Sequence, residues 1–269
     1  MADYLYHLRT RYWNDVKPPR DALPDLSHPL AQGLVGDWNM SEGEGLLAFD
    51  RAGTVRGSPN HGTLVNGPTW VGDRGGATEY VHTNTEHIAL PAGTFGVGAD
   101  NRTTVVWFYT LTTGTGTLLA QGANLAGQRW KIIAEPDALA LRVSSGSRTW
   151  TATGMENAWH QIAVVLDGTS TTDTIGYMDG QALAIASTSA RTLNIGAADA
   201  RIGGDASQSE YLSGFIGQVL QYNVALAADD IAQLFSEPYA YYPRPRRSWY
   251  TSVSAVGVYP IFGGRHVIR

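Results

Sequence analysis

The sequence predicts an all-β protein, and three observations carry this prediction. The chain of 269 residues contains thirty-one glycines and no cysteine, so turns are abundant and disulfides are excluded. Short runs of β-branched residues with alternating side chains recur along it, separated by turn residues about every 8–12 positions. Roughly thirteen such runs in one chain are typical of a β-sandwich or a β-barrel.

Residues 1–27 are expected to form an extended N-terminal arm. The segment is rich in Tyr, Arg and Pro, and the prolines of Lys17-Pro18-Pro19-Arg20 and Leu23-Pro24 interrupt any long helix. It lacks the apolar stretch of an export signal, and no part of the chain approaches the roughly 20 apolar residues of a membrane span. We therefore expect neither export by such a signal nor a membrane partner.

From Leu34 onward, predicted strands follow one another closely. In the run WHQIAVVLDG, residues 159–168, apolar and small side chains alternate on the two faces of a strand, and His160 is expected to be a hydrogen-bonded sheet residue. In the later run YMDGQAL, Asp179-Gly180 separates two strand segments, and this pair suits the positive φ angles of a type I′ turn. An antiparallel hairpin is expected there.

One short helix is predicted near the C-terminus, from Ala227 to Phe235. Ile231 and Leu234 share an apolar face, while Asp229 and Asp230 lie in the first turn, where the helix dipole favours acidic groups. Ala227 has no side-chain oxygen to serve as an N-cap, which forfeits about 1 kcal/mol of capping free energy. Packing must therefore hold the helix in place.

Charge is distributed unevenly along the chain. Residues 1–30 carry four basic and four acidic groups, residues 31–237 carry ten basic and twenty acidic, and residues 238–269 carry five arginines and no acid. The acidic body argues against nucleic-acid binding by that part of the molecule.

The basic segment, residues 239–269, is expected to form a C-terminal arm. Its arginines alternate with aromatic residues and prolines, a composition that fits contact with nucleic acid but suits docking on a protein partner better. Many large aromatic groups in the two arms would be costly to leave in water. The residues predicted to dock on other copies of the chain, or on a capsid or tail protein, are Tyr12, Trp13, Tyr241, Tyr242, Arg244, Arg246, Arg247, Trp249 and Tyr250.

The order of landmarks resembles the laminin-G-like, concanavalin-A-like jelly-roll family over about residues 28–237. The segments that carry the resemblance are HPLAQGLVGDWNMSEGEG, AFDRAGTVRGSPNHGTLVNGPTW, WHQIAVVLDG, YMDGQAL, RIGGD and GFIGQVLQYNVALAADDIAQLF. It implies a two-sheet antiparallel β-sandwich, with a domain at residues 28–238 between the two arms. The stretch LFSEPYAYYPRPRRSW is similar to the end of such domains in tailed-phage virion proteins.

The resemblance also implies a candidate calcium site. Members that bind calcium often place an acid in the strand before the YN pair, where this chain has the neutral amide of Gln218, a weaker ligand for a hard cation. The loop from Asp50 to Asn60 is the candidate site, with these two residues as ligands. No other cofactor is expected.

Glucanases of this superfamily carry paired carboxylates on one strand, and the sequence offers no such set. The nearest match is Glu135-Pro136-Asp137. The third carboxylate of the set is missing, and Pro136 does not suit a central strand, so we expect a turn here rather than a catalytic strand. No catalytic residue is therefore predicted, and the protein is not expected to be an enzyme. The polar loop from Asp205 to Tyr211 is the candidate rim of a ligand site, through Asp205, Gln208 and Tyr211; the alternative is a solvated turn.

Three functions follow from these patterns. The first is a virion structural protein, a phage capsid decoration or tail-associated protein that its arms anchor and that contributes to assembly and to adhesion to host glycans. The second is a carbohydrate-binding module of a bacterial surface or secreted protein, and the third is a glycoside hydrolase. Residues 28–238 alone are expected to fold as a β-sandwich.

Overall fold

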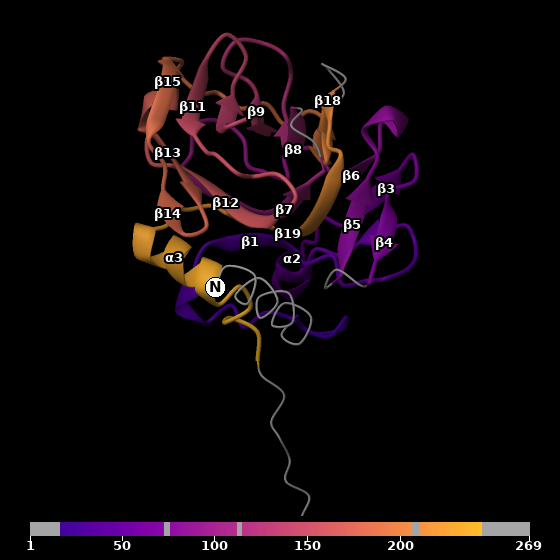
Figure 1. Cartoon of the computed structure of the whole chain (residues 1–269). Helices are drawn as coiled ribbons and strands as arrows, with labels where there is room; N and C mark the ends of the chain where they lie inside the picture. The colour runs from indigo at the N-terminus through magenta and orange to yellow at the C-terminus, as the bar shows by residue number, and fades with distance from the viewer. Residues whose placement is uncertain (1–16, 73–75, 112–114, 206–209, 244–269) are drawn as a thin grey trace, which may run out of the picture.

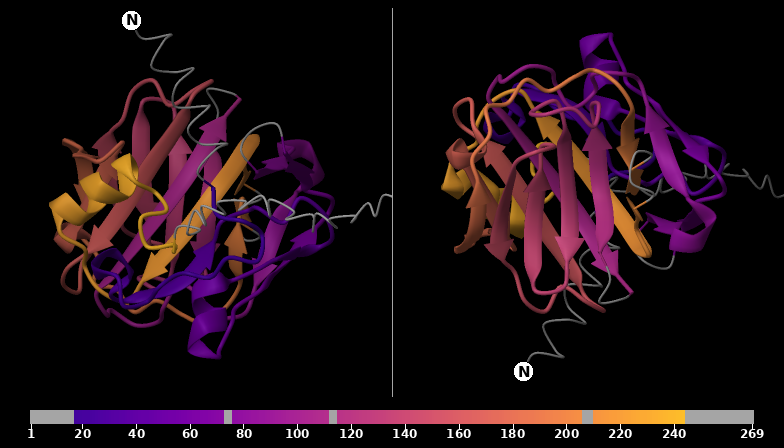
Figure 2. Two further views of the ribbon diagram at one scale, coloured as in Figure 1. Left: turned by 90° about the horizontal axis from the view of Figure 1, so that it is seen from below. Right: turned by 90° about the horizontal axis from the view of Figure 1, so that it is seen from above.

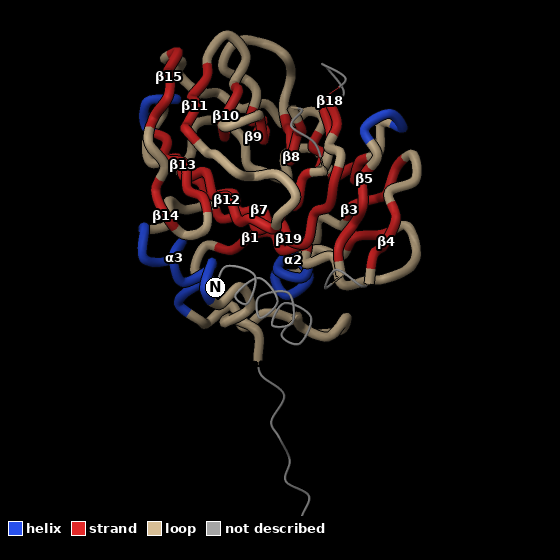
Figure 3. Tube along the Cα trace, in the orientation of Figure 1, coloured by secondary structure: helices blue, strands red, loops and turns tan. Residues whose placement is uncertain are grey.

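Two antiparallel sheets face each other as a β-sandwich, with short helices at its periphery (Figure 1). The computed structural model describes residues 17–72, 76–111, 115–205 and 210–243. Figure 3 shows how strands and loops dominate this part of the chain. The all-β class, the two-sheet sandwich and the short C-terminal helix are confirmed.

The first sheet has eight strands in the order β14-β13-β12-β7-β19-β5-β4, and β1 pairs with β19 outside this path. Its longest strands, β7, β12 and β19, lie side by side at its centre. The strands are β1 (Leu34–Trp38), β4 (Thr69–Val71), β5 (Ala77–Tyr80), β7 (Arg102–Thr110), β12 (Trp159–Leu166), β13 (Thr174–Met178), β14 (Gln181–Ala182) and β19 (Gly214–Tyr222).

The second sheet has nine strands in the order β15-β11-β10-β9-β8-β16-β6-β3-β2. They are β2 (Leu47–Ala48), β3 (Gly62–Val65), β6 (His87–Leu90), β8 (Gly116–Gln121), β9 (Trp130–Glu135), β10 (Ala138–Arg142), β11 (Ser147–Thr151), β15 (Ile185–Ser189) and β16 (Ala200–Ile202). A separate two-stranded ladder joins β17 (Gly204–Asp205) to β18 (Glu210–Tyr211).

The described helices are short. They are the α-helices α2 (Arg51–Arg56) and α3 (Ala228–Ser236) and the 3-10 helices η1 (Pro29–Ala31), η2 (His82–Asn84) and η3 (Thr171–Asp173). Both α-helices lie on the same side of the molecule, below the eight-stranded sheet in Figure 1. Within the described ranges, none of the helices has the length and apolar character needed to cross a membrane.

The main hydrophobic core fills the space between the two sheets. Alternate residues of each strand point into it, as the period of a β-strand requires. Trp38, Trp130 and Trp150 are its largest side chains, each at most 1 % exposed. Burial on this scale provides the main stabilising contribution of the sandwich.

A second apolar cluster covers the outer face of the eight-stranded sheet. There Val105, Ala163 and Leu220 of the central strands pack under Ile231 and Leu234 of α3. The view from below in Figure 2 shows α3 and the N-terminal segment lying across these strands. The cluster also contains the side chains of Leu30, Tyr239, Tyr241 and Tyr242. The described parts of both expected arms, residues 17–27 and 239–243, therefore pack against the sandwich.

Several local predictions are confirmed. β12 and β13 pair antiparallel, and Asp179 and Gly180 join β13 to β14 with φ angles of 50° and 78°. Helix α3 begins after Ala227, which makes no side-chain cap, although the Asp230 carboxylate accepts the Ala227 N–H at 3.2 Å. α2, in contrast, forms where a loop was expected.

Candidate functional site

A polar pocket of about 250 Å³ opens at one end of the nine-stranded sheet. Its lining residues are Asn124, Arg129, Arg142, Ser144, Ser145, Gly146, Ser147 and Ser189. Antiparallel pairing brings them together, because Arg142 of β10 lies opposite Ser147 of β11, which lies opposite Ser189 of β15. β9, β10 and β11 lie on the opposite side of the molecule from α2 and α3 (Figure 3).

The hairpin that joins β10 to β11 forms one wall of the pocket. Ser144 and Ser145 occupy its two central positions with φ angles of 56° and 55°, and the Val143 N–H donates to the Gly146 carbonyl at 3.1 Å. A two-residue turn of this kind favours Asn-Gly, because both positions need positive φ. Serine in this region costs on the order of 1 kcal/mol per residue, so the surrounding contacts must hold the turn.

Three contacts hold the turn from outside. The Ser144 hydroxyl donates to Asn124 Oδ1 at 2.7 Å, and the Gly127 N–H donates to the Ser144 carbonyl at 3.1 Å. The Ser145 carbonyl accepts from Nε and Nη2 of Arg191 at 3.1 and 3.0 Å. The loop before β9 and the segment after β15 thereby clamp the hairpin, and the pocket wall is preorganised.

Arg129 lies at the floor of the pocket and is only 2 % exposed. Its Nη2 forms an ion pair with the Asp205 carboxylate, and its Nη1 donates to Asn124 Oδ1 at 3.4 Å. Within the described residues its Nε has no hydrogen-bond partner. Burial lowers the pKa of Arg129, while the nearby carboxylates of Glu210 and Asp199 raise it, and a guanidinium keeps its proton under such conditions.

Lys131 of β9, two positions after Arg129, contacts the same carboxylate. Its Nζ lies 2.7 Å from the same Asp205 carboxylate and also pairs with Glu210. Burial is the main cause that lowers the pKa of Lys131, and the Glu210 carboxylate opposes it. Asp205 therefore lies between two buried cations and fixes the direction of the Arg129 side chain.

Arg142 is the more exposed of the two cations that line the pocket. Its side chain is 45 % exposed, and it forms an ion pair with Glu135, which lies across the β9–β10 hairpin. An exposed pair of this kind contributes little to stability. Arg142 can therefore exchange this partner for a ligand at little cost to the fold.

The predicted ligand rim needs correction. Asp205 was expected at an exposed rim, but it is 2 % exposed and holds Arg129 from behind the pocket. Tyr211 is 8 % exposed and packs on His87, with ring centroids 6.1 Å apart. Gln208 lies outside the described residues. Of the described residues of this loop, Asp205 therefore has the role of positioning Arg129.

The expected calcium site has a different role in the structure. Asp50 is the N-cap of α2, and its carboxylate accepts the N–H groups of Asp37, Gly53 and Asn60 at 2.9 to 3.1 Å. The carbonyl of Asn60 accepts from the indole of Trp38 at 3.0 Å. N–H groups directed at a carboxylate occupy the lone pairs that a cation would need. Asp50 and Asn60 do not fit calcium.

Two of the predicted docking residues are buried within the chain itself. Tyr241 is fully buried and Tyr242 is 6 % exposed. Their hydroxyls donate to the Asp37 carboxylate at 3.3 and 2.6 Å, and Gln218 Nε2 donates to the Tyr241 hydroxyl at 3.0 Å. Both tyrosines thus attach the segment after α3 to β1 and β19. Their side chains are buried within the chain rather than exposed for docking on a partner. Tyr12, Trp13, Arg244, Arg246, Arg247, Trp249 and Tyr250 lie outside the described residues.

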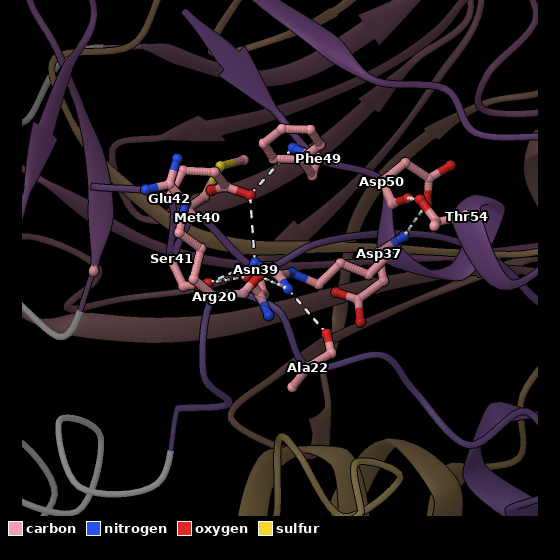
Figure 4. A network of polar contacts seen from close by, with 12 residues as sticks. Arg20, Ala22, Asp37, Asn39, Met40, Ser41, Glu42, Phe49, Asp50 and Thr54 are labelled. Atoms are coloured by element: carbon pink, nitrogen blue, oxygen red, sulfur yellow. Dashed lines mark hydrogen bonds and ion pairs between the residues drawn. The ribbon is translucent and has the colours of Figure 1, made fainter. Parts of the chain in front are cut away.

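A buried polar network continues from Asp37 along the N-terminal segment, and Figure 4 shows it. The Phe49 N–H donates to Glu42 Oε1 at 3.1 Å, and the Ser41 hydroxyl donates to Asn39 Oδ1 at 2.8 Å. Arg51 reaches the Ala22 carbonyl at 2.9 Å and lies 3.6 Å from Glu42. These contacts join α2 to the start of the described chain, so the network has a structural role.

The carboxylates that resemble a glucanase motif lie at a turn, as predicted. Glu135 ends β9, and Asp137 has a φ of 57° in the connection to β10. His160 is a hydrogen-bonded sheet residue, since its ring nitrogens lie 2.8 Å from Asp179 Oδ2 and 3.0 Å from the Gly154 carbonyl.

The residues that line the pocket were not predicted. They come from separate parts of the sequence, so no motif with a fixed spacing joins them. The run Ser144-Ser145-Gly146-Ser147, flanked by Arg142, was the only local signal of a polar turn at a strand end. Correct pairing of β10, β11 and β15 was needed to place Ser189 beside it.

Solved structures with the same fold come from several sources. A Trypanosoma rangeli sialidase in complex with sialic acid aligns with a TM-score of 0.56 and 16 % identity, over 85 % of this chain. The binding domain of botulinum neurotoxin DC in complex with SialylT aligns with a TM-score of 0.56 and 9 % identity over 77 % of this chain. The binding domain of paraclostridial mosquitocidal protein 1 aligns with a TM-score of 0.55 and 14 % identity, also over 77 % of this chain. The chain spans 37 % of the sialidase chain and 52 % of each toxin chain.

Sequence comparison agrees with the fold. No curated protein sequence matches the chain. A family model, described as the concanavalin A-like lectin/glucanases superfamily, matches residues 82–232, which is more than half of the chain. These residues include the central strands of the eight-stranded sheet and all of the residues that line the pocket. The chain belongs to the concanavalin A-like lectin/glucanases superfamily.

Proposed function

We propose that the protein is a carbohydrate-binding domain and that the pocket at the β10–β11 hairpin is its binding site. The observation that carries this proposal is the lining of the pocket, which consists of four serines, one asparagine, two arginines and a glycine. Sugars present many hydroxyl groups, and such side chains can donate to and accept from them. The volume, near the lower end of small-molecule sites, suits one or two sugar rings.

The structural neighbours support this proposal at the level of the fold. The sialidase was solved with sialic acid and the botulinum neurotoxin domain with SialylT. Their identities of 16 % and 9 % carry the fold and not the site. The argument for this chain therefore rests on its own pocket.

The proposal is one of binding without turnover. The carboxylates nearest the pocket are paired, since Asp205 holds Arg129 and Lys131, and Glu135 pairs with Arg142. A glycosidase needs one carboxylate as an acid and another as a nucleophile or base on either side of the sugar. We expect no hydrolysis of glycans, measured as released reducing ends.

Glycan binding can be tested with a glycan array and with chemical-shift mapping of the isotope-labelled full chain. Ser189→Trp on β15 fills the pocket and should abolish binding. Ser187→Trp is the matched control, because Ser187 is exposed on the same strand and does not line the pocket. Glycan binding that persists in Ser189→Trp, or shifts that map elsewhere, would overturn the assignment of this site.

A role in a phage particle is the second proposal, and the charge of the C-terminal segment favours it. Residues 238–269 carry five arginines and no acid, whereas the body is acidic. In this proposal the segment beyond residue 243 attaches the lectin-like domain to a capsid or tail protein, or to further copies of the chain, and the protein resides in the virion. The alternative location is the bacterial surface or the extracellular space. Co-sedimentation of the full chain, but not of a chain ending at residue 243, with purified particles is the expected result.

A further inference from the structure

The charges around the pocket point to a narrower class of ligand. Two of the eight lining residues are arginines, and none of the eight is acidic. We infer that the pocket takes a sugar that carries a carboxylate, such as a uronic or a sialic acid. This inference rests on the proposed function and specifies the ligand of the same site.

Arg129 supplies a fixed positive charge at the floor of the pocket. Its Nη2 pairs with Asp205, which Lys131 shares, and the carboxylates of Glu210 and Asp199 also act on its charge. None of these carboxylates lines the pocket. Within the described residues the Nε of Arg129 has no hydrogen-bond partner, so Arg129 keeps a donor for an acceptor of the ligand.

Arg142 supplies the contacting group at the rim. Its guanidinium has five N–H donors, and the ion pair with Glu135 uses Nη2. A carboxylate of the ligand can therefore form two parallel hydrogen bonds with Arg142, which is the strong geometry for this pair. Glu135 competes with the ligand for the same guanidinium.

The neutral groups of the pocket suit the rest of a sugar ring. Asn124 Oδ1 accepts from Ser144 and Arg129, so the amide nitrogen is the group that Asn124 can offer to a ligand as a donor. Ser145, Ser147 and Ser189 add hydroxyls around the opening. The arginines would thus select for the carboxylate, while the hydroxyls and the amide would bind the ring.

The sharpest test compares each acidic sugar with its own methyl ester. Glucuronate, galacturonate and N-acetylneuraminate are titrated into the isotope-labelled full chain, and each methyl ester is titrated in parallel. At least one acid should bind ten-fold or more tightly than its ester, with shifts at the pocket, and its affinity should fall as salt rises from 50 to 500 mM. Inorganic phosphate is titrated as well, and phosphate binding stronger than that of every sugar would contradict the inference.

Two opposite substitutions test the roles of the charges. Arg142→Gln should weaken binding of the acid about ten-fold or more and leave the ester unchanged. Glu135→Gln should strengthen binding of the acid several-fold, because Arg142 loses its competing partner; a misfolded protein cannot give this result. Arg20→Gln is the control, since Arg20 also forms an exposed ion pair, with Glu44, but does not line the pocket.

The outcomes separate this inference from the proposed function. Equal affinity for acids and esters at the pocket would overturn the selectivity for carboxylates and leave the carbohydrate site standing. If no glycan of either kind binds the pocket, both proposals fail. A gain in Glu135→Gln together with a loss in Arg142→Gln supports both.

Discussion

The carboxylate of Asp37 is fully buried, which is unusual for an ionisable side chain. Burial raises its pKa to about 6, while the hydrogen bonds from Tyr242 and Gln218 and the charge of Arg51 hold it lower than burial alone would. The tyrosine hydroxyls that reach it come from the segment after α3. One side chain therefore links β1 to the C-terminal part of the described chain, and its protonation should affect stability.

We expect Asp37→Asn to change the dependence of stability on pH. Between its ordinary pKa of 3.8 and about 6, Asp37 binds more protons in the folded than in the unfolded state. Its contribution to the free energy of unfolding therefore falls as pH rises through this window. Asparagine cannot ionise, so the variant should gain stability relative to the wild type from pH 4 to 6, and the difference should level off at higher pH.

Urea unfolding of both proteins at half-unit steps from pH 3.5 to 8 measures this difference. Asp25→Asn is a suitable control, because Asp25 is exposed and its pKa is lowered by hydrogen bonds from Ser27. That shift has the opposite sign, so the control should show no relative gain over the same range. A pH-independent difference for Asp37→Asn would contradict the raised pKa.

Residues in local patterns were predictable, and residues in long-range contacts were not. Asp179-Gly180 and Ala227 act within a few positions of themselves, so their roles follow from turn and capping chemistry. Arg129 and Asp205 are 76 positions apart, and nothing in either neighbourhood marks them as partners. Asp205 was expected at an exposed ligand rim but is buried, because the sequence does not show the burial of a polar residue at the end of a loop.

At the level of elements, α2 shows how a resemblance can mislead. Asp50 at the N-cap and Gly57 at the C-cap, with a φ of 77°, are ordinary helix boundary signals. The expectation of a calcium loop led Asp50 to be interpreted as a ligand, together with Asn60. Carboxylates that cap helices and carboxylates that bind metals share a sequence pattern, and only the hydrogen-bond partners separate them.

Helix α3 offers a second test at this scale. Ala227 has extended backbone angles, φ −72° and ψ 159°, which suit an N-cap, but no side chain that can accept a hydrogen bond. Ala227→Ser should therefore raise the free energy of unfolding by about 1 kcal/mol. Ala228→Ser, one position inside the helix, is the matched control and should be neutral or slightly destabilising. Urea unfolding of the three proteins checks this, and equal effects at both positions would contradict a capping mechanism.

For the whole molecule, the number and spacing of the predicted strands indicated the sandwich. Alternating side chains within a strand and turn residues between strands are local signals, and the sequence repeats them many times. The boundaries of the folded unit were harder to predict. Proline and tyrosine at the ends of the chain suggested arms that extend away from the domain. A chain segment without regular secondary structure can still bury apolar side chains. Here residues 239–243 bury three tyrosines on the outer face of the eight-stranded sheet, and Ala22 and Leu26 of residues 17–27 pack against the same cluster.

This arrangement leads us to expect that residues 28–238 alone are less stable than a chain that includes the flanking segments. Removing residues 239–243 would take three buried tyrosine rings out of the outer apolar cluster and would leave the buried Asp37 without its tyrosine partners. A fully buried aromatic or aliphatic side chain contributes roughly 1.5–3 kcal/mol, and a buried carboxylate that loses its donors adds to the cost. A chain of residues 28–238 should therefore be several kcal/mol less stable than a chain of residues 17–243, or should aggregate.

Urea unfolding and dye binding to exposed apolar surface compare the two chains directly. Tyr241→Phe with Tyr242→Phe, in the longer chain, separates the hydroxyl contacts with Asp37 from the burial of the rings. This double variant should lie between the two chains in stability, because it keeps the apolar contacts and loses only the hydrogen bonds. If residues 28–238 proved as stable as residues 17–243, the terminal segments would be accessory to the fold, and an exposed outer sheet face would have to be stable in water without them.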